Sequence, residues 1–427
     1  MALQTLHNVN MHPEITTRRN SLTLFVTLLV AACGGPDSEP SNATVQALAV
    51  PAAVGGRSPN LAAGADGRLL LSWIEPAADG HALVYAELSD GRWSQAKEVA
   101  SGDNWFVNWA DFPSVVPLSS GLLAAHWLVS QPAGGYAYDV LFSISTDDGG
   151  NWTEPLRPHR DGTATEHGFV SIYPHAEGAG LVWLDGRNTA QAPISATAPN
   201  GMTLRAAVIG PDLTLRHEQV VDGLICDCCQ TDVAVTAAGP VGVYRDRSAE
   251  EVRDIYVTRS VNDDWRAGQP IAHDQWNIAA CPVNGPAISA SGDALAVAWF
   301  TAAADTPVVR LAFSDDAGAS FSTPVDIATG RVFGRVGIAL LPGGAAAVSW
   351  LGKTSDQHAQ LKIVAVSAEG TLGKPVVVGR GDTISGFTVP QLVLHDDRLV
   401  MAWTATVDDA NLVRSARIAL SALGATD

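Results

Sequence analysis

The sequence is poor in charged residues, and those it has are mostly acidic. Only 16% of its 427 residues are Asp, Glu, Lys or Arg, whereas 47% are hydrophobic, which excludes an intrinsically disordered chain. The 26 Lys and Arg are outnumbered by 44 Asp and Glu, so the net charge is −18. A surface of this sign repels nucleic acid phosphates and anionic lipid headgroups, and we expect no nucleic-acid partner.

Long apolar runs are also missing. The run Leu22–Val30 is too short to span a bilayer as a helix, and no second run of membrane-spanning length follows it. Arg18 and Arg19 precede this run and small residues follow it, a pattern typical of a signal peptide. We therefore expect an exported protein with a soluble body.

The end of this signal carries a second pattern. The segment LVAAC, ending at Cys33, resembles a bacterial lipobox, which implies cleavage before Cys33 and lipidation of its sulfur. An ordinary signal peptide followed by a stray cysteine is the alternative. Residues 34–42 predict a flexible tether, leaving residues 43–427 as a single domain anchored to the bacterial cell envelope. Gly34 favours the outer membrane; the membrane, its face and the true start codon stay open.

Turn-forming residues, by contrast, are abundant, with 40 glycines and 24 prolines. One unit recurs seven times: a short alternating run, a turn, and an apolar run that ends in an aromatic residue, at intervals of 51 to 61 residues. The aromatic residues are Trp73, Trp127, Trp183, Tyr244, Trp299, Trp350 and Trp403. Each unit reads as a β-hairpin, and a weaker hairpin follows it, so that two hairpins make a four-stranded blade. The repeats predict an all-β propeller of seven blades, with six as the alternative.

The last unit contains only one clear strand after Trp403, at residues 412–420. We expect residues 44–50 to supply the missing strand, because pairing between the chain ends removes two exposed sheet edges.

Polar residues gather just before the innermost strand of each predicted blade, where propeller loops converge on the central channel. In chain order they are Arg57; Asn108 and Asp111; Glu166 and His167; Cys226 to Asp232; Cys281 and Asn284; Arg335; and Thr388.

Two kinds of motif resemble the sialidase superfamily of BNR or Asp-box propellers. Residues 145–152 (STDDGGNW) and 314–321 (SDDAGASF) resemble Asp boxes, which are structural hairpin turns. Residues 56–61 (GRSPNL) resemble the sialidase opening R-I-P-x-L, although Ser58 replaces its usual aliphatic residue. The resemblance implies six blades and an exo-alpha-sialidase activity in which three arginines clamp the substrate carboxylate.

Carried over residue by residue, the resemblance makes Arg57 one clamp arginine by motif. Arg335 and either Arg245 or Arg247 qualify only as arginines at suitable blade positions. Guanidinium suits this role because it stays charged and donates two parallel hydrogen bonds.

Sialidase chemistry also needs a tyrosine nucleophile, a glutamate that activates it and an aspartate acid/base. We assign Tyr244 as candidate nucleophile, Asp111 as acid and Glu166 as base. Tyr244 occupies the position that tryptophan fills in other units, which favours a packing role. Further substrate-binding candidates are Asn108, His167, Arg245, Arg247, Asn284 and Arg335.

Cysteine is scarce, and after Cys33 only Cys226, Cys228, Cys229 and Cys281 remain. An even number in an exported protein predicts disulfides that link the fourth blade to the fifth through Cys281; of the three possible pairings, the one that joins the adjacent Cys228 and Cys229 would be strained. The alternative is a thiolate metal site for copper or zinc, with His167 or His273 nearby. We expect no cofactor, with this metal site as the alternative.

Three functions follow. The leading hypothesis is a sialidase-like, glycan-active surface lipoprotein, an exo-acting glycoside hydrolase for a glycan or small carboxylate-bearing substrate. The second is a non-catalytic Asp-box propeller that binds glycan or a protein partner at the envelope. The third, a thiol-metal protein, requires four reduced cysteines. Fold alone does not choose among them.

Overall fold

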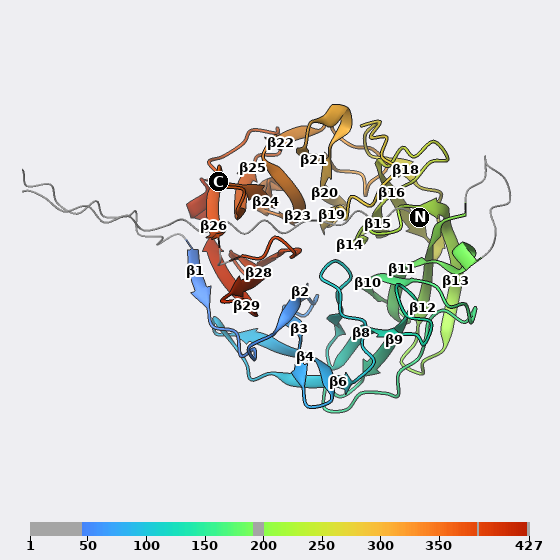
Figure 1. Ribbon diagram of the computed structural model, residues 1–427. Helices are drawn as coiled ribbons and strands as arrows, with labels where there is room; N and C mark the ends of the chain where they lie inside the picture. Colours follow the sequence, from blue (N-terminus) through green and yellow to red (C-terminus); the bar gives the residue numbers. More distant parts are fainter. Residues whose placement is uncertain (1–44, 191–199, 382–383, 425–427) are drawn as a thin grey trace, which may run out of the picture. The chain divides into compact units, whose positions relative to one another are not determined.

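A computed structural model of the chain describes residues 45–190, 200–381 and 384–424, all of which belong to one compact unit (Figure 1). Within these residues, seven antiparallel sheets follow one another around a ring, which makes a seven-bladed β-propeller. The predicted signal peptide, Cys33 and the tether lie outside the described residues. No helix in the described part of the chain has the length and apolar character needed to cross a membrane.

The first three blades run from the innermost strand outward in chain order. Blade 1 is β2 (Arg57–Ala63), β3 (Leu69–Ala77) and β4 (Gly80–Ser89), with β5 (Arg92–Trp93) and β6 (Lys97–Gly102) at its outer edge. Blade 2 is β7 (Ser114–Ser119), β8 (Leu122–Ser130) and β9 (Tyr138–Ser145), edged by a bridge from Phe142 to Leu156. Blade 3 is β10 (His167–His175), β11 (Gly178–Asp185), β12 (Met202–Ile209) and β13 (Leu215–Ile225).

The remaining blades repeat this order. Blade 4 is β14 (Asp232–Thr236), β15 (Gly239–Arg245) and β16 (Ile255–Val261), with β17 (Asp264–Trp265) and β18 (Gln269–Pro270) outside. Blade 5 is β19 (Ala287–Ser291), β20 (Ala294–Thr301), β21 (Val308–Ser314) and β22 (Val325–Thr329). Blade 6 is β23 (Val332–Leu340), β24 (Ala346–Lys353), β25 (Ala359–Val366) and β26 (Val376–Arg380), and blade 7 is β27 (Gln391–His395), β28 (Arg398–Val407), β29 (Ala410–Ala419) and β1 (Val45–Leu48). Short 3-10 turns occur at Arg187–Ala190, Ala303–Asp305, Pro342–Gly344 and Leu420–Leu423.

The ring closes as the sequence predicts. β1 pairs with β29 in antiparallel register, from Val45 opposite Ile418 to Leu48 opposite Ser415. The first described strand thus becomes the outer strand of the last blade and covers the edge that β29 would otherwise expose.

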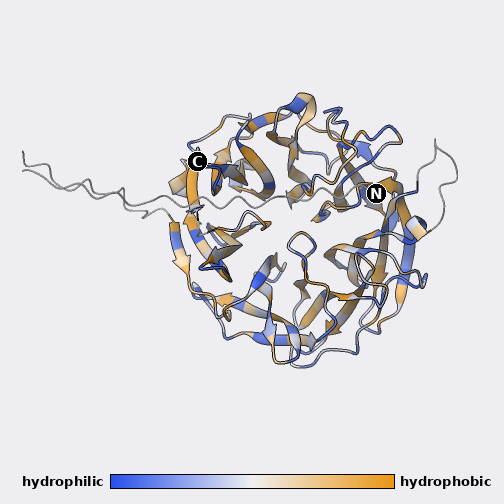
Figure 2. Cartoon of the chain, in the orientation of Figure 1, coloured by the Kyte–Doolittle hydropathy of each residue, from blue (hydrophilic) through white to orange (hydrophobic). Residues whose placement is uncertain are grey.

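The repeated aromatic residues all fall on the second strand of their blades and are buried there. Trp73, Trp183 and Trp299 have no exposed surface. Apolar residues follow the strands of every blade (Figure 2), so the core lies between neighbouring sheets. The recurring aromatic is therefore an inter-blade packing residue.

The two turns at residues 145–152 and 314–321 share one hydrogen-bond pattern. Oδ1 of Asp147 accepts the backbone N–H of Asn151 at 2.8 Å, and Oδ1 of Asp316 accepts that of Ser320 at 2.9 Å. Hydrogen bonds from Ser320 lower the pKa of Asp316 to about 2. Each turn follows the third strand of its blade and braces a hairpin; that they are Asp boxes by repeat type stays a prediction.

Candidate functional site

A cavity of about 1060 Å³ lies on the propeller axis. The innermost strands of all seven blades line it with apolar and neutral polar residues, and Asp232 is the charged exception in that lining. Oδ2 of Asp232 accepts a hydrogen bond from the backbone N–H of Ile288 at 2.9 Å. The predicted acids and arginines are absent from this lining, so the cavity and the candidate chemistry are distinct.

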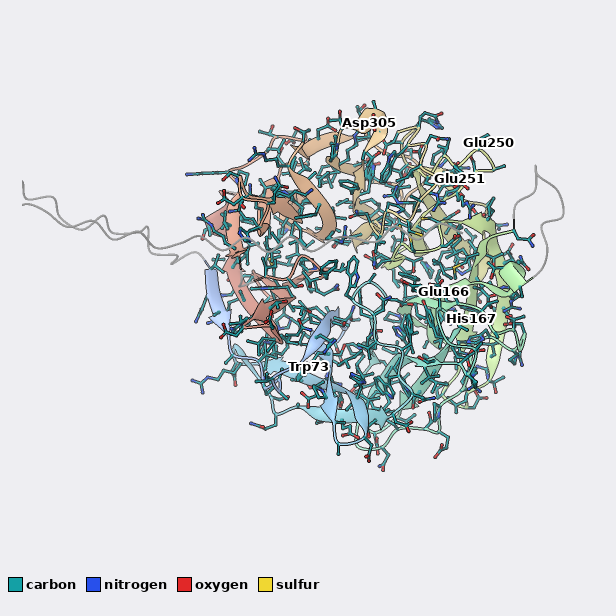
Figure 3. All side chains as sticks on the ribbon, viewed as in Figure 1. Trp73, Glu166, His167, Glu250, Glu251 and Asp305 are labelled. Atoms are coloured by element: carbon teal, nitrogen blue, oxygen red, sulfur yellow. The ribbon has the colours of Figure 1, made fainter. Side chains whose placement is uncertain are left out.

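The structure brings two of the predicted acids together on a tyrosine that the sequence analysis did not select. The Tyr138 hydroxyl lies 2.6 Å from Oδ2 of Asp111 and 2.9 Å from Oε1 of Glu166. Tyr138 begins β9, and its ring stacks on Phe106 with centroids 4.0 Å apart. Oδ1 of Asp111 accepts the N–H of Phe169 at 2.8 Å, which ties the loop of blade 2 to blade 3. Figure 3 shows Glu166 next to His167 at the start of blade 3.

This arrangement requires a shared proton. A phenol has one hydrogen, so Tyr138 can donate to only one of the two carboxyl groups, and the other must itself be protonated to bond to the phenol oxygen. Burial raises the pKa of Asp111 to about 7 and, with the nearby charge of Asp111, raises that of Glu166 to about 8. Burial also raises the pKa of Tyr138 well above its usual value, so the phenol stays neutral. At neutral pH the cluster therefore holds a proton on a carboxyl group.

Glu166 is the member of this cluster that faces solvent. Its side chain is partly exposed, whereas Tyr138 is 1% and Asp111 2% exposed. Any ligand that approaches from outside thus meets Glu166 first, backed by the buried pair.

Tyr244 has a different role. It lies in β15, 1% exposed, and its hydroxyl donates to Oδ2 of Asp222 at 2.6 Å. It belongs to the packed core between blades 3 and 4, as its equivalence to the repeated tryptophans predicts. Tyr138 was missed because it stands at the start of a third strand, where the repeat has no marker. The chain has only six tyrosines, so considering each of them as a candidate nucleophile would have included Tyr138.

Gly168 is the residue that lets the cluster close. A Cβ at this position would lie 1.9 Å from Oδ2 of Asp111 and 2.8 Å from the Tyr138 hydroxyl. We expect Gly168→Ala to destabilise the fold by about 1–3 kcal/mol, because the overpacked cluster must shift. Urea unfolding measures this, with Gly223→Ala as control because a Cβ there meets nothing within 4 Å. Equal midpoints for the two variants would contradict the packing argument.

Arg57 in β2 and Arg335 in β23 do not occupy equivalent positions in their blades. Bulges interrupt β2, β10 and β23, and Ser58, Phe169 and Arg335 adopt positive φ angles of 55°, 52° and 55° there. Arg335 therefore corresponds to Ser58, and Arg57 lies one residue earlier than the position that Arg335 occupies. The Nε of Arg57 donates to Gly55 O at 3.3 Å.

Arg335 keeps free donors. Its guanidinium lies 4.8 Å from the ring centroid of Trp109, and Nη1 donates to Phe333 O at 3.1 Å. Nε has no partner, and no carboxylate among the described residues forms a salt bridge with Arg335. Trp109 in turn contacts Phe387, which is 70% exposed. An unpaired cation on an aromatic platform is suited to an anionic sugar.

Arg245 and Arg247 are committed to internal contacts. Arg245 is 2% exposed and donates to the carbonyls of Asn284, Arg253 and Phe300. Arg247 pairs with Glu251 at 2.6 Å and with Asp227 at 3.4 Å. These contacts join loops of blades 3, 4 and 5, which argues against the predicted substrate-binding role of both arginines.

The two predicted amides are also bound internally. Oδ1 of Asn284 accepts the N–H of Arg335 at 2.8 Å, and Oδ1 of Asn108 accepts that of Ala110 at 2.8 Å. Both amide oxygens thus hold the loops that carry the site.

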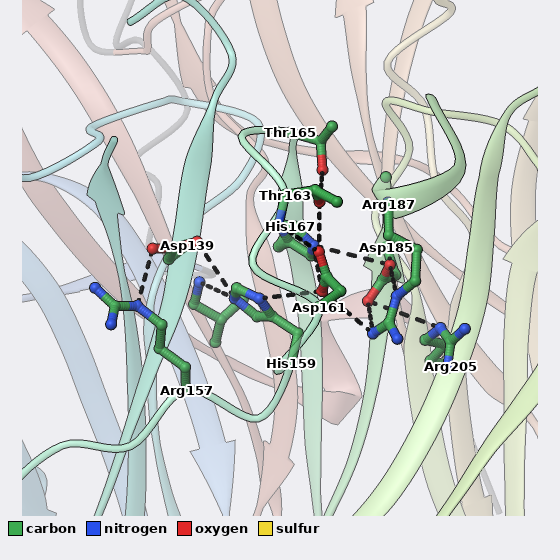
Figure 4. Close-up of polar contacts among 12 residues, drawn as sticks. Asp139, Arg157, His159, Asp161, Thr163, Thr165, His167, Asp185, Arg187 and Arg205 are labelled. Atoms are coloured by element: carbon green, nitrogen blue, oxygen red, sulfur yellow. Dashed lines mark hydrogen bonds and ion pairs between the residues drawn. The ribbon is translucent and has the colours of Figure 1, made fainter. Parts of the chain in front are cut away.

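His167 lies in an ion-pair network between blades 2 and 3 (Figure 4). It is fully buried, stacks on His159 at 3.8 Å, and its Nε2 lies 3.2 Å from Oδ2 of Asp161. At one end of this network Asp139 pairs with Arg157, and at the other end Asp185 pairs with Arg187. The His and Asp atoms lie close enough together for a metal ion, but these arginines already neutralise the carboxylates, and the buried His167 does not reach a ligand from solvent.

The cysteines gather at the loops before blades 4 and 5, as predicted, but all four are free. The Sγ atoms of Cys226 and Cys229 are 3.6 Å apart, far beyond the S–S bond of about 2.05 Å. The predicted disulfides are thus not seen among the described residues.

Comparison with known proteins identifies the class of fold. The sequence matches no protein-family model and no curated protein. A lectin of Burkholderia pseudomallei matches with a TM-score of 0.57 and 12% identity, over 85% of this chain and 96% of the lectin. An α-L-arabinofuranosidase of Fusarium graminearum matches at 0.49 and 15%, over 88% and 98%. A Trypanosoma rangeli sialidase matches at 0.44 and 10%, over 77% of this chain and 57% of that one. At such low identity the likeness shows the propeller fold alone.

Proposed function

We propose that this protein is a glycan-active propeller that hydrolyses a carboxylate-bearing sugar, with Glu166 as the proton donor. The observation that carries the proposal is the Tyr138 hydroxyl held between Asp111 and Glu166 at 2.6 and 2.9 Å. The tyrosine–glutamate pair required by the sialidase resemblance is thus present, with Tyr138 in place of Tyr244. The lectin that shares this fold gives a further reason to test sugars first.

The proposed roles follow from charge and exposure. Glu166, whose pKa of about 8 keeps it protonated at neutral pH, protonates the leaving oxygen of the glycosidic bond. Water supplies the oxygen that bonds to the anomeric carbon in its place, and the proton that this water loses restores the acid form of Glu166. Asp111 and Tyr138, buried on the inner side of Glu166, hold the other exchangeable protons of this hydrogen-bonded cluster. Arg335 on Trp109 binds the sugar carboxylate, because a guanidinium with free donors is suited to a bidentate contact.

The spacing of the carboxyl groups is shorter than an inverting reaction requires. Inverting glycosidases hold their carboxyl groups roughly 6.5–9.5 Å apart, to admit a water molecule. Here one phenol oxygen lies 2.6 and 2.9 Å from both, which places them closer together than that.

Glu166→Gln is expected to lower kcat on a fluorogenic sialoside by about 10²–10⁴-fold, since amide nitrogen cannot serve as a general acid. Wild-type turnover should persist below about pH 8 and decline above it, as Glu166 loses its proton. Glu154→Gln, at an exposed position outside the cluster, is the matched control and should retain wild-type turnover. Equal turnover by the two variants would remove Glu166 from the mechanism.

A binding function without catalysis is the second candidate, and the burial of Tyr138 and Asp111 favours it. If folded wild-type protein turns over no sialoside but binds sialylated or uronic-acid glycans on an array, this candidate holds. Arg335→Ala should then abolish binding, whereas Arg266→Ala, at an exposed ion pair with Asp264, should not.

A further inference from the structure

Four sulfur atoms converge beside the Glu166 cluster, and none of the proposed glycan chemistry uses them. Cys226, Cys228 and Cys229 lie in the loop between β13 and β14, and Cys281 lies in the loop between β18 and β19. The first three Sγ atoms all lie within 4.8 Å of one another. Cys281, in the loop that leads to the next blade, is close enough to interact electrostatically with Cys226 and Cys228, so a fourth sulfur lies near this group.

The spacing is that of thiolates around a common centre. Sulfur ligands of a tetrahedral Zn²⁺, each at about 2.3 Å from the ion, lie about 3.8 Å apart. The 3.6 Å between the Cys226 and Cys229 sulfurs is close to this value. A single disulfide, by comparison, would use two sulfurs and leave two thiols facing each other.

The surroundings stabilise negative charge on the sulfurs. Nη1 of Arg253 donates to Sγ of Cys226 at 3.3 Å, and the N–H of Asn284 donates to Sγ of Cys229 at 3.4 Å. Arg253 is 4% exposed and is itself fixed by Glu251 at 2.7 Å. Donors aimed at ligand sulfurs from such rigid positions are typical of the residues that support thiolate metal sites.

Nearby positive charge offsets that of the ligands. The guanidinium groups of Arg245 and Arg253 both lie close enough to the Cys226 sulfur to interact with its charge, and Arg253 donates to it directly. Several thiolates around a monovalent or divalent cation leave a net negative charge, and these arginines compensate it in a buried place.

We propose that Cys226, Cys228, Cys229 and Cys281 bind one thiophilic d¹⁰ metal ion, Cu(I) or Zn²⁺. Thiolate is the ligand that selects these ions over harder ones, and each thiol that coordinates releases its proton to solvent. Three sulfurs are enough for Cu(I), whereas Zn²⁺ needs the fourth from Cys281 to complete its tetrahedron. The site would link the loops of blades 4 and 5, and it stands independently of the glycan proposal.

The test titrates the full-length reduced protein, under argon, with Zn²⁺ against a chromophoric chelator and with Cu(I) against a Cu(I)-specific chelator. We expect one ion per chain and an ultraviolet charge-transfer band. Cys229→Ser should weaken binding of the bound ion at least 100-fold. Asp227→Asn, which keeps all four thiols, should stay within about 3-fold of wild type.

Cys281→Ser distinguishes the two ions. Zn²⁺ binding should fall at least 10-fold in this variant, whereas Cu(I) binding should change much less if three sulfurs suffice. If a serine variant fails to fold, native wild-type protein is alkylated with and without metal, and protection of the four thiols is mapped by peptide mass. Protection by metal supports the site. Unprotected thiols, binding that survives Cys229→Ser, or disulfides that form again and exclude metal would overturn it.

Discussion

Asp185→Ala is expected to destabilise the protein by about 3–5 kcal/mol, because it leaves a partly buried guanidinium without its main partner. Asp185 is fully buried, and its two carboxylate oxygens accept Nε and Nη2 of Arg187 at 2.6 and 2.7 Å. Oδ2 also accepts the indole N–H of Trp183 at 3.0 Å. One carboxylate thus satisfies both a repeated core tryptophan and the ion pair with Arg187, the latter drawn in Figure 4.

Urea unfolding of this variant beside Asp264→Ala measures the effect. Asp264 pairs with Arg266 at 3.1 Å, but both side chains are more than half exposed, so its loss should cost less than about 1 kcal/mol. A loss for Asp185→Ala as small as that of the control would show that Asp161 or Glu218, at 3.5 and 4.0 Å from Arg187, takes over the ion pair.

Asp111→Asn is expected to remove a large part of the pH dependence of stability. Burial raises the pKa of Asp111 from 3.8 to about 7. Between these values the folded state binds more protons than the unfolded state, so the free energy of unfolding falls as pH rises through this window. A raise of this size corresponds to about 4 kcal/mol at most, at 1.36 kcal/mol for each pKa unit.

Asparagine mimics the protonated carboxyl group. Its oxygen can accept the Phe169 N–H, and its amide can donate to the Tyr138 oxygen, leaving the phenol hydrogen for Glu166. The variant should therefore match wild type near pH 4 and exceed it in stability near pH 8. Thermal unfolding from pH 4 to pH 9 measures this, and parallel curves for the two proteins would show that Asp111 is not the buried acid. Glu166, Asp232 and Asp246, whose pKa values are also raised, are present in both proteins.

The propeller could be predicted because its evidence is local and repeated. Alternation of apolar residues, turn chemistry and a recurring aromatic at Trp73, Trp183 and Trp299 depend on neighbours within one hairpin. Seven repeats therefore gave seven blades against the six that the sialidase resemblance implies, and closure by Val45–Leu48 follows from the same count.

The site could be predicted only in part. The loops before the innermost strands carry Asp111 and Glu166, and Arg335 lies in the first half of the innermost strand β23. These positions could be predicted because the repeat places the start of every innermost strand at the same end of the ring. The repeat pattern does not show which of these side chains contact one another at that end of the ring. Asp111 and Phe169 are 58 residues apart, and Tyr138 reaches both acids from a strand that the pattern does not mark.

By itself, then, the sequence determined the fold class, the blade number, the closing strand and the loops where polar groups gather. Tertiary structure alone decided that Tyr138 rather than Tyr244 joins the acids. It also decided that internal partners take up the donors of Arg245 and Arg247 but leave Nε of Arg335 without one, and that the cysteines lie near one another without a disulfide. The physical reason is that strand patterns arise from short-range periodicity, whereas pKa values, ion pairing and sulfur contacts depend on burial and distance between loops of neighbouring blades.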